Sequence, residues 1–311
     1  MRKIKLILFL FSLLTASLYS QTPDASSVLK SAHEKLKNQD YTGAIKDFNK
    51  ALRMSPGSEE ALRGRAEAKF NISQNEEALR DINKAIEINK DIPEAYLIRG
   101  QIYTVTKHFD EAISDFTKAL SLNDKLYEAI VQKALTYSQM DKEKEAFDLI
   151  NKSIESDVNI AEFYFCRGVL YNNKQKFEKA LNDFNKCLEL NPAYTTNNVY
   201  LARGSSYLGL QEYKSAMEDF TKAIEVSPNN ATAYSSRARV YYEEGNYNDA
   251  VQDYTKSLEL NSDNATTFFN LGMAYYKLND IKNACERFHK ACSMGNSNAC
   301  KMIVIACVES K

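Results

Sequence analysis

The chain contains 311 residues, with 40 Lys and Arg against 41 Asp and Glu, and only 10 Gly and 5 Pro. The shortage of Gly and Pro excludes collagen-like, flexible low-complexity and turn-dense all-β architectures, and a hydrophobic content of 44% argues against wholesale disorder. The balanced charge argues against a nucleic-acid-binding protein, which would carry a basic excess. Length alone would suggest about two ordinary domains.

The first twenty residues have the layout of a secretory signal peptide. Three basic residues among the first five precede a nine-residue stretch, 6–14, that is apolar except for Ser12. Because this stretch is about half of the roughly 18 residues that span a bilayer, an uncleaved anchor is the weaker alternative. We predict a signal peptide over 1–20, cleaved after Ser20 or after Ser17, a linker over 21–24, and an exported protein that is periplasmic, cell-surface or secreted.

The rest of the chain is one unit repeated eight times. Small residues recur in steps of 34 residues, with one step of 36, and large apolar residues recur in the same steps. The small residues are Ala32, Ala66, Gly100, Ala134, Gly168, Gly204, Ala238 and Gly272, and the large residues are Phe48, Ile82, Phe116, Ile150, Phe184, Phe220, Tyr254 and Phe288. The copies are predicted at 25–58, 59–92, 93–126, 127–160, 161–196, 197–230, 231–264 and 265–298.

Each copy is predicted to form two helices. Its apolar residues are three or four positions apart, as are Tyr96, Gly100 and Tyr103 in the third copy, and this is the α-helical period. One short helix pair cannot bury its apolar face alone, so the stacking of neighbouring pairs must supply the core. Residues 299–311 lack the repeat and are predicted to form a C-terminal capping helix.

This pattern resembles the tetratricopeptide repeat, whose motif spreads a large residue, Leu-Gly, Tyr, Ala, Phe, Ala and Pro over 34 positions. The fifth and sixth copies match it best, with Tyr164, Gly168, Tyr171, Ala180, Phe184, Cys187 and Pro192, and with Tyr200, Gly204, Tyr207, Ala216, Phe220, Ala223 and Pro228. The resemblance covers about nine-tenths of the chain. It implies an all-α fold, a right-handed α-solenoid, or superhelix, of stacked antiparallel helix pairs.

Some residues depart from the motif. Lys35 and Lys69 stand where the family prefers Tyr, Glu143 replaces an aromatic residue and Val158 replaces Pro. We therefore expect the first, second and fourth copies to be less rigid. The two additional residues of the fifth copy fall near 193–198, where they are expected to lengthen the turn to the next repeat.

Charged residues also follow the repeat. Asp stands three residues before a recurring Lys in six copies, at Asp47, Asp81, Asp115, Asp183, Asp219 and Asp253. We interpret these residues mainly as a solvated outer face, on which each same-helix pair stabilises the helix by about 0.2–0.5 kcal/mol. Arginines on the first helices are alternative partners for these Asp residues. We therefore predict that several ion pairs join neighbouring helices, and the candidate arginines are Arg65, Arg99, Arg167, Arg203 and Arg237.

Four of the six cysteines cluster near the C-terminus, at Cys285, Cys292, Cys300 and Cys307. Disulfides are possible in an exported chain, but cysteines seven residues apart on one helix are separated by about 10.5 Å, too far to bond each other. An antiparallel cap helix would instead pair Cys292 with Cys300 and Cys285 with Cys307. The alternative is a set of small buried thiols, and the spacing does not favour a tetrahedral metal site.

No residue pattern typical of catalysis is found in the sequence. His33, His108 and His289 are far apart and are not near a Cys or Ser in a nucleophile arrangement, and no glycine-rich phosphate loop is present. We therefore predict no enzymatic activity, no cofactor and no metal. Cys166 and Cys187 are expected to remain buried thiols.

The resemblance implies that the first helices line a concave groove that contacts a partner. The predicted groove residues are Leu97, Gln101, Val131, Leu135, Phe165, Val169, Leu201, Arg239, Tyr242, Phe269, Met273 and Tyr276. The middle of this set is apolar, which suits an extended segment or an amphipathic helix of another protein. Ordinary packing between first helices is an equal alternative for Leu97 and Leu201.

These patterns predict an exported, non-catalytic scaffold that binds a protein or peptide and has no transmembrane segment in its mature form. Where some relatives grip a C-terminal carboxylate, this chain carries mostly Leu, Val, Phe and Ser, so that mode of binding is not expected. Two alternatives remain: a self-assembling structural or cell-envelope protein and, less favoured, an enzyme with an unrecognised site. The sequence is compatible with a monomer or a weak homo-oligomer and does not identify the partner.

Overall fold

A computed structural model describes residues 24–192 and 199–307. All regular structure in these ranges is helical, with helices α2 to α18 and one π-helical turn, η1. This confirms the all-α class and the stacked helix pairs. The predicted signal peptide, most of the linker and the additional residues of the fifth copy lie outside the described ranges. No helix within these ranges is both long and apolar enough to span a bilayer.

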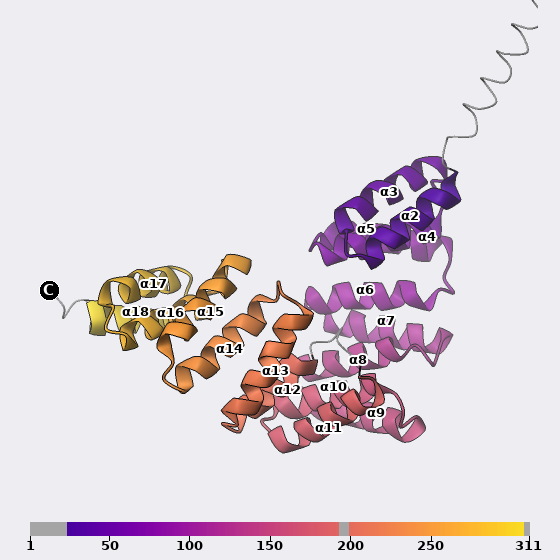
Figure 1. Cartoon of the computed structure of the whole chain (residues 1–311). Helices are drawn as coiled ribbons and strands as arrows, with labels where there is room; N and C mark the ends of the chain where they lie inside the picture. The colour runs from indigo at the N-terminus through magenta and orange to yellow at the C-terminus, as the bar shows by residue number, and fades with distance from the viewer. Residues whose placement is uncertain (1–23, 193–198, 308–311) are drawn as a thin grey trace, which may run out of the picture. The chain divides into compact units, whose positions relative to one another are not determined.

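The chain divides into two compact units, one ending at Ala146 and the other beginning at Phe147. The division falls inside α9 (Glu143–Ser156). In the first unit, the two helices of a copy pack against each other, and each pair packs against the next (Figure 1). The helices of this unit that precede α9 are α2 (Ala25–Lys37), α3 (Tyr41–Met54), α4 (Glu59–Asn71), α5 (Asn75–Ile88), α6 (Pro93–Val105), α7 (Phe109–Leu122) and α8 (Tyr127–Gln139).

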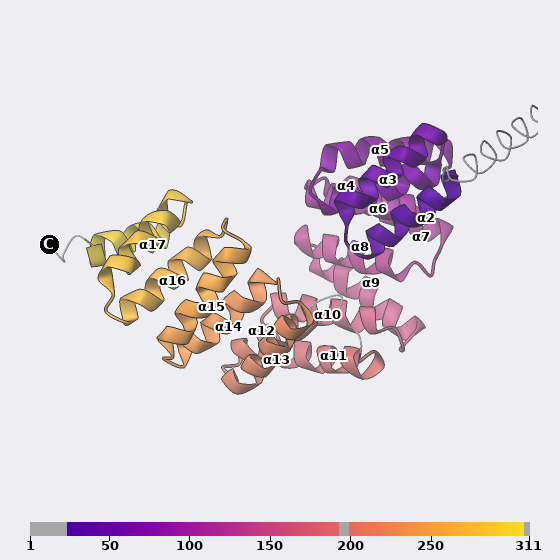
Figure 2. The ribbon, with the colours of Figure 1, turned by 45° about the horizontal axis from the view of Figure 1, so that its top comes forward.

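The second unit stacks helix pairs in the same way, and Figure 2 shows α14 to α17 side by side. The first helices of successive copies also contact one another, from α10 to α12, α14 and α16. The helices that follow α9 are α10 (Ala161–Asn173), α11 (Phe177–Leu190), α12 (Val199–Gly209), α13 (Tyr213–Val226), α14 (Ala231–Glu243), α15 (Tyr247–Leu260), α16 (Ala265–Lys277), α17 (Ile281–Ser293) and α18 (Ser297–Met302), with η1 at Ile303–Cys307.

The turn inside every copy is made by one residue in the left-handed region. These residues have φ between 56° and 81° and are Gln39, Ser73, Lys107, Asp141, Gln175, Gln211, Gly245 and Asn279. In the first copy, the N–H of Asp40 donates to the carbonyl of Lys35 and that of Gln39 to Leu36, which is the hydrogen-bond pattern of a Schellman motif. Seven of the eight residues are not Gly, so a chain poor in Gly still turns tightly, at a cost of about 1–2 kcal/mol per residue.

The core consists of the two recurring sets of small and large residues. The rings of Phe48, Phe116 and Phe184 are completely buried, and so is the ring of Phe220. A Cβ atom added to Gly204 would lie 2.8 Å from Phe220 Cε1, closer than ordinary van der Waals contact. The small residue therefore lets the two helices of a copy approach closely, and the ring fills the space beside it.

The predicted ion pairs between helices are confirmed in five copies. Each arginine donates from Nε and Nη2 to one carboxylate at 2.5–3.0 Å, in the pairs Arg65–Asp81, Arg99–Asp115, Arg167–Asp183, Arg203–Asp219 and Arg237–Asp253. In four of them Nη1 also donates to an asparagine on the second helix of the preceding copy, at 2.6–2.9 Å. One guanidinium therefore joins three helices.

The interpretation of these aspartates as a solvated face is wrong. All five are buried, with 2–8% of their surface exposed. Each faces the first helix of its own copy, where the bidentate arginine supplies the compensating charge that a buried carboxylate requires. In the first two copies Lys35 and Lys69, which replace the expected Tyr, bind Asp47 and Asp81 at 2.6 and 2.7 Å.

Copies one, four and eight lack the Arg–Asp pair, and in the first copy Ser31 and Lys35 bind Asp47 instead. At the arginine position of the fourth copy, Lys133 donates to Thr117 Oγ1 at 2.8 Å, and burial lowers the pKa of its ammonium group. Leu149 stands at the aspartate position of that copy. In the eighth copy the two positions hold Leu271 and Arg287, and the buried Nε of Arg287 has no hydrogen-bond partner among the described residues.

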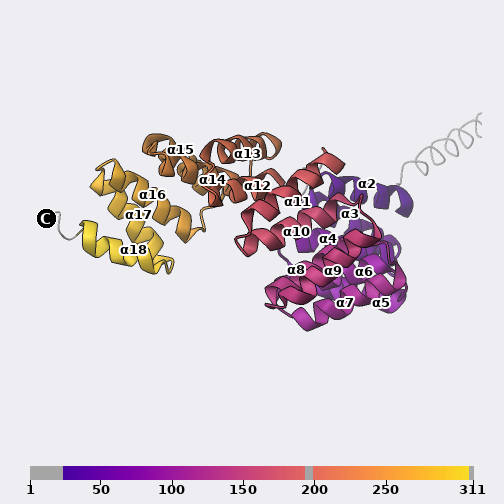
Figure 3. The same cartoon turned by 90° about the horizontal axis from the view of Figure 1, so that it is seen from below.

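The C-terminal cap begins at Ser297, two residues before the predicted start (Figure 3). Asn296 caps α18 by accepting from the N–H of Ala299 at 3.0 Å. Ala299 and Ala306 are buried against a cluster that contains Phe288, so the cap covers the last apolar face of the described repeats.

Two disulfides join the cap to α17. They link Cys285 to Cys307 and Cys292 to Cys300, with Cα–Cα distances of 5.8 and 4.9 Å. These are the two pairs that an antiparallel arrangement of the cap and α17 requires.

Candidate functional site

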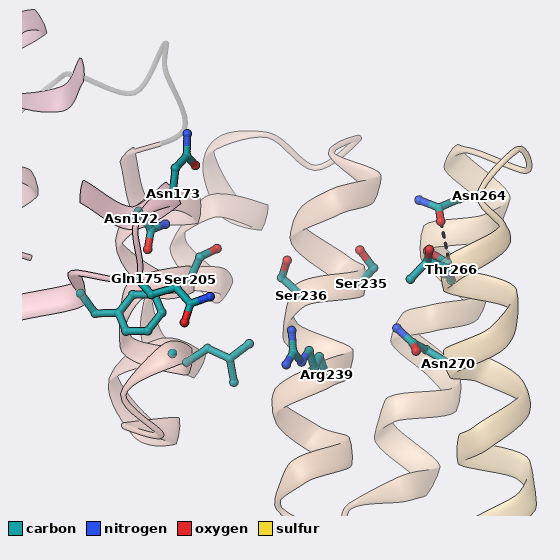
Figure 4. Close-up of a pocket in the computed structure, with 14 residues that line it drawn as sticks. Asn172, Asn173, Gln175, Ser205, Ser235, Ser236, Arg239, Asn264, Thr266 and Asn270 are labelled. Atoms are coloured by element: carbon teal, nitrogen blue, oxygen red, sulfur yellow. Dashed lines mark hydrogen bonds between the residues drawn. The ribbon is translucent and has the colours of Figure 1, made fainter. Parts of the chain in front are cut away.

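A cavity of about 550 Å³ opens between the first helices of the second unit, and we call it the amide cavity. Its polar lining residues come from α10, α12, α14 and α16 and from the residues that flank these helices (Figure 4). They are Asn172, Asn173, Gln175, Ser205, Ser235, Ser236, Arg239, Asn264, Thr266, Thr267 and Asn270. In Figure 4, Ser235, Ser236 and Arg239 lie between the group around Asn172 and the group around Asn270.

Several side chains of the amide cavity are oriented by the scaffold. Asn172 Oδ1 accepts from Ser206 Oγ at 3.1 Å, and Asn264 Oδ1 accepts from the N–H of Thr267 at 3.0 Å at the start of α16. These bonds occupy the carbonyl oxygens and direct the two amide groups. Within the described residues, no hydrogen bond to the side chain of Ser236 or Asn270 is found, so both can bind a ligand.

Among the described residues, Arg239 is the one charged residue that lines the amide cavity. Its Nε lies 3.9 Å from Glu243 Oε1, and the two side chains are 61% and 41% exposed. An exposed pair at this distance contributes little to stability because water screens it. The guanidinium of Arg239 can therefore exchange this partner for a carboxylate of a ligand at small cost.

A second cavity of about 370 Å³ adjoins the first, and we call it the aromatic pocket. It lies among α14, α15 and α16, and four predicted groove residues line it: Arg239, Tyr242, Phe269 and Met273. Burial raises the pKa of Tyr242 above its ordinary value, and Tyr247 and Glu243 raise it further. The ring of Phe269 packs on Phe288, with centroids 6.0 Å apart.

The first unit has a different cavity, of about 320 Å³, which we call the acidic pocket. Glu67, Glu94 and Glu128 line it together with the predicted residues Leu97 and Gln101. Burial raises the pKa of Glu67, and the nearby charge of Glu128 raises it too, although Arg63 and His33 lower it. Gln101 Nε2 donates to Glu128 Oε1 at 2.9 Å, and Leu97 is only 6% exposed, which agrees with packing between first helices.

The other predicted groove residues do not line these cavities. Val131 and Leu135 are half-buried on α8, and Val169 is half-buried on α10. The ring of Phe165 packs on Phe184, with centroids 5.9 Å apart. Leu201 and Tyr276 pack against the buried clusters of α13 and α17, respectively.

Most of the polar lining was not predicted, although the sequence contains a signal for it. Ser235 occupies the same repeat position as the predicted Phe165 and Phe269, and Ser205 occupies that of Arg239. Asn172 likewise corresponds to Tyr242 and Tyr276. Because these residues are polar, they do not mark an apolar groove, but their repeat positions place them on the same surface.

Two buried thiols lie in the fifth copy, and neither resembles a reactive cysteine. Burial raises the pKa of Cys166 to about 12, and burial together with the charge of Glu162 raises that of Cys187 to about 12. Thiols with such pKa values contain almost no thiolate at neutral pH, and thiolate is the nucleophile. No group of three or more His, Cys, Asp or Glu side chains within 24–192 and 199–307 could hold a metal ion.

Comparison with known families gives matches along most of the chain. One family model, described as TPR repeat, matches residues 204–245 and 238–279. Four models described as tetratricopeptide repeat match residues 29–90, 93–126, 161–194 and 266–293. A search of curated protein sequences found no significant match.

Solved structures share the fold at low sequence identity. One is a chain of the APC/C hetero-tetramer Cut9–Hcn1, with 16% identity and a TM-score of 0.65 over 86% of this chain and 52% of that one. The present chain therefore spans about half the length of that relative. Another is pilF of Pseudomonas aeruginosa, with 19% identity and a TM-score of 0.59 over 68% of this chain and 96% of that one.

Proposed function

Because this chain belongs to the tetratricopeptide-repeat family, whose fold is suited to protein–protein interaction, we propose that it is a non-catalytic scaffold that binds an extended segment of another protein in the amide cavity. The observation that carries the proposal is the lining of that cavity by neutral amides and hydroxyls from four successive first helices. The partner is therefore expected to lie across several repeats.

The chemistry of the lining suits a peptide backbone. An amide side chain carries both a donor and an acceptor, which are the two groups that each residue of an extended chain presents. Asn172 and Asn264 present their amide N–H groups, because their carbonyl oxygens already accept a hydrogen bond. Asn172 lies on α10, whereas Asn264 caps α16 and Asn270 lies on it, so amides stand at both ends of the cavity, and hydrogen bonds orient the first two. Groups that are fixed before binding lose less conformational entropy when a partner binds, and this favours affinity.

The neutral character of the lining has a consequence for specificity. Arg239 is the only charge of the lining within the described part of the chain, so away from Arg239 the amide cavity does not select the charge of the bound segment. Contacts to the backbone provide affinity irrespective of sequence, while neighbouring pockets select side chains. We expect the cavity to hold extended segments of varied sequence.

We further propose that the protein is exported. The basic and apolar N-terminal sequence and the two C-terminal disulfides support this, because disulfides persist mainly in oxidising compartments. Mass spectrometry of protein isolated from its native cells tests it. The expected product starts near Gln21 and has both disulfides intact, whereas a full-length, reduced chain in the cytoplasm would contradict the proposal.

A random library of linear peptides displayed on phage tests the binding function. After selection on the wild-type protein, the recovered peptides are synthesised with a fluorophore, and their affinities are measured by fluorescence anisotropy. The double variant Asn172→Ala/Asn270→Ala is expected to bind every recovered peptide with an affinity about tenfold lower, or lower still, because it lacks two hydrogen-bonding groups of the site.

A matched control is Asn182→Ala, which changes an exposed asparagine of α11 that does not line the cavity. Its affinities should equal those of the wild type, and circular dichroism should give both variants the wild-type helix content. Recovery of no peptide above background, or equal affinities for the double variant and the wild type, would overturn the proposal.

A further inference from the structure

We infer that the bound segment carries a large apolar side chain within two residues of an Asp or Glu. The apolar side chain enters the aromatic pocket, and the carboxylate binds Arg239. This inference rests on the proposed function, because it specifies the side chains of the segment whose backbone lies in the amide cavity.

The two cavities are parts of one continuous surface. Arg239, Thr266 and Asn270 line both of them. A peptide held in the amide cavity therefore passes the entrance of the aromatic pocket. A side chain of the peptide that lies beside this entrance can therefore extend out of the amide cavity into the aromatic pocket.

The aromatic pocket suits an apolar side chain. Its apolar walls are Tyr242, Phe269 and Met273, and Tyr254 is only 1% exposed. Its polar lining consists of Glu243 and the three residues shared with the amide cavity. Its volume of about 370 Å³ falls within the range of about 300–1,000 Å³ that is usual for ligand pockets. Aromatic rings and a flexible thioether adapt to aromatic or branched aliphatic groups, and burial of such a group supplies affinity.

Charge complementarity defines the second element of the partner. Arg239 stands where the two cavities meet, and its nearest carboxylate, that of Glu243, is 3.9 Å away. A guanidinium can bind a carboxylate through two parallel hydrogen bonds, which the present separation from Glu243 does not provide. An acidic side chain of the partner can form this bidentate contact.

The geometry of an extended peptide limits the spacing of the two side chains. Alternate side chains lie on the same face, about 6.6–6.8 Å apart, and adjacent ones point to opposite faces. Because Arg239 lines both cavities, a carboxylate bound to it must belong to a residue near the apolar anchor. This limits the separation to one or two positions in the sequence.

The same displayed library tests the inference with three protein baits: wild type, Arg239→Glu and Met273→Glu. Peptides recovered on the wild type should be enriched in a large apolar residue within two positions of Asp or Glu. On Arg239→Glu the acidic residue should be replaced by Lys or Arg. On Met273→Glu the apolar preference should disappear.

Affinities of synthetic peptides make the test quantitative. Changing the acidic residue of a recovered peptide to its amide should weaken binding to the wild type by about tenfold and should have much less effect on binding to Arg239→Gln. Changing it to Lys should restore binding to Arg239→Glu. The controls are Arg80→Gln and Met54→Glu, at exposed positions outside both cavities, and they should bind as the wild type does.

The outcomes separate this inference from the proposed function. If the affinity of recovered peptides depends on Asn172 and Asn270 but not on Arg239 or Met273, the amide cavity binds peptides and the inference is wrong. Absence of any enriched motif on the wild type would also contradict it. If no peptide binds, or if the asparagine variant has no effect, the proposed function and the inference both fail.

Discussion

Glu67 in the first unit and Arg239 in the second occupy the same position of the repeat, although their charges are opposite. Each lies on a first helix and lines a cavity, Glu67 with two further carboxylates and Arg239 with neutral amides and hydroxyls. The two copies that carry them are built alike. Each has a buried small residue, Ala66 or Ala238, a buried large residue at the matching position of the second helix, and an Arg–Asp pair that joins the two helices. One scaffold therefore supports two chemically different surfaces.

The contacts that hold a repeat together explain why the scaffold is the same in both units although the surfaces differ. Scaffold residues contact their own copy and the next one, and so they must recur in every copy. Glu67 and Arg239 themselves line cavities, and neither belongs to the recurring small, large or Arg–Asp positions that form the core. Selection on this surface is then free to act on each copy separately.

The largest expected effect follows from breaking the common scaffold in either unit. Asp115→Ala in the first unit and Asp219→Ala in the second each leave a half-buried arginine without its carboxylate, which should reduce the free energy of unfolding by about 3 kcal/mol. Urea denaturation followed by circular dichroism measures both losses. The double replacement Arg203→Met/Asp219→Leu is the control, and it should recover most of the stability because no unpaired charge remains. If the two variants lost different amounts of unfolding free energy, the Arg–Asp pair would not stabilise the two units equally.

The next effect should be confined to the second unit, where the two disulfides lie. Cys292→Ser/Cys300→Ser opens a short loop and should reduce the stability of the C-terminal cap by about 2–4 kcal/mol. Hydrogen exchange should show faster exchange in α17 and α18, with unchanged protection in α4 to α6. Addition of a reductant to the wild type should reproduce the pattern. Equal loss of protection in both units would refute the local role of the disulfides.

A smaller effect is expected from the close approach of the helices in each copy. Gly100→Ala and Gly204→Ala place a Cβ atom 2.6 Å and 2.8 Å from the rings of Phe116 and Phe220, and the crowding should cost about 1–3 kcal/mol in each unit. Gly57→Ala is the matched control, because no atom lies within 4 Å of the added Cβ. In thermal unfolding, the control should have a melting temperature close to that of the wild type, and both helical variants should have lower melting temperatures.

The smallest effect distinguishes the two surfaces by pH. Since burial raises the pKa of Glu67 in the folded protein, its contribution to stability is greatest below the unfolded value of about 4.3 and is lost as pH rises through the folded pKa. Glu67→Gln should therefore be more stable than the wild type at neutral pH and show little difference in acid. The melting temperatures of Glu67→Gln and the wild type, compared at neutral and at acidic pH, measure this difference in stability. A stabilisation of Glu67→Gln that does not depend on pH would mean that the charge of Glu67 is not its cause.

The sequence predicted the helix pairs well because the residues that form them recur at a fixed period. The recurrence alone identifies the small and large core residues, and it also identifies the arginines that pair with aspartates. The burial of those aspartates was not predicted. A repeating charged residue has the same pattern on a solvated face as at a helix interface, and only the position of the first helix distinguishes the two.

The amide cavity was predicted only in part. The predicted groove contains Arg239 but not Ser205, Ser235 or Asn172, because apolar residues stand at the same positions in other copies and mark that face more strongly. The repeat position of each polar residue could have been read from the sequence. Their assembly around one cavity could not, because the lining residues come from helices of four successive copies.

By itself, the amino-acid sequence determined the repeat, its helix pairs and its core, since these depend on contacts within a copy and with its immediate neighbour. The tertiary structure decided which side chains meet on the first helices of the second unit. Residues as far apart as Asn172 and Asn270 line one cavity because the stacking of α10, α12, α14 and α16 brings them to the same surface. No local sequence pattern predicts that these side chains lie together, because their positions depend on how each helix pair packs against the next pair.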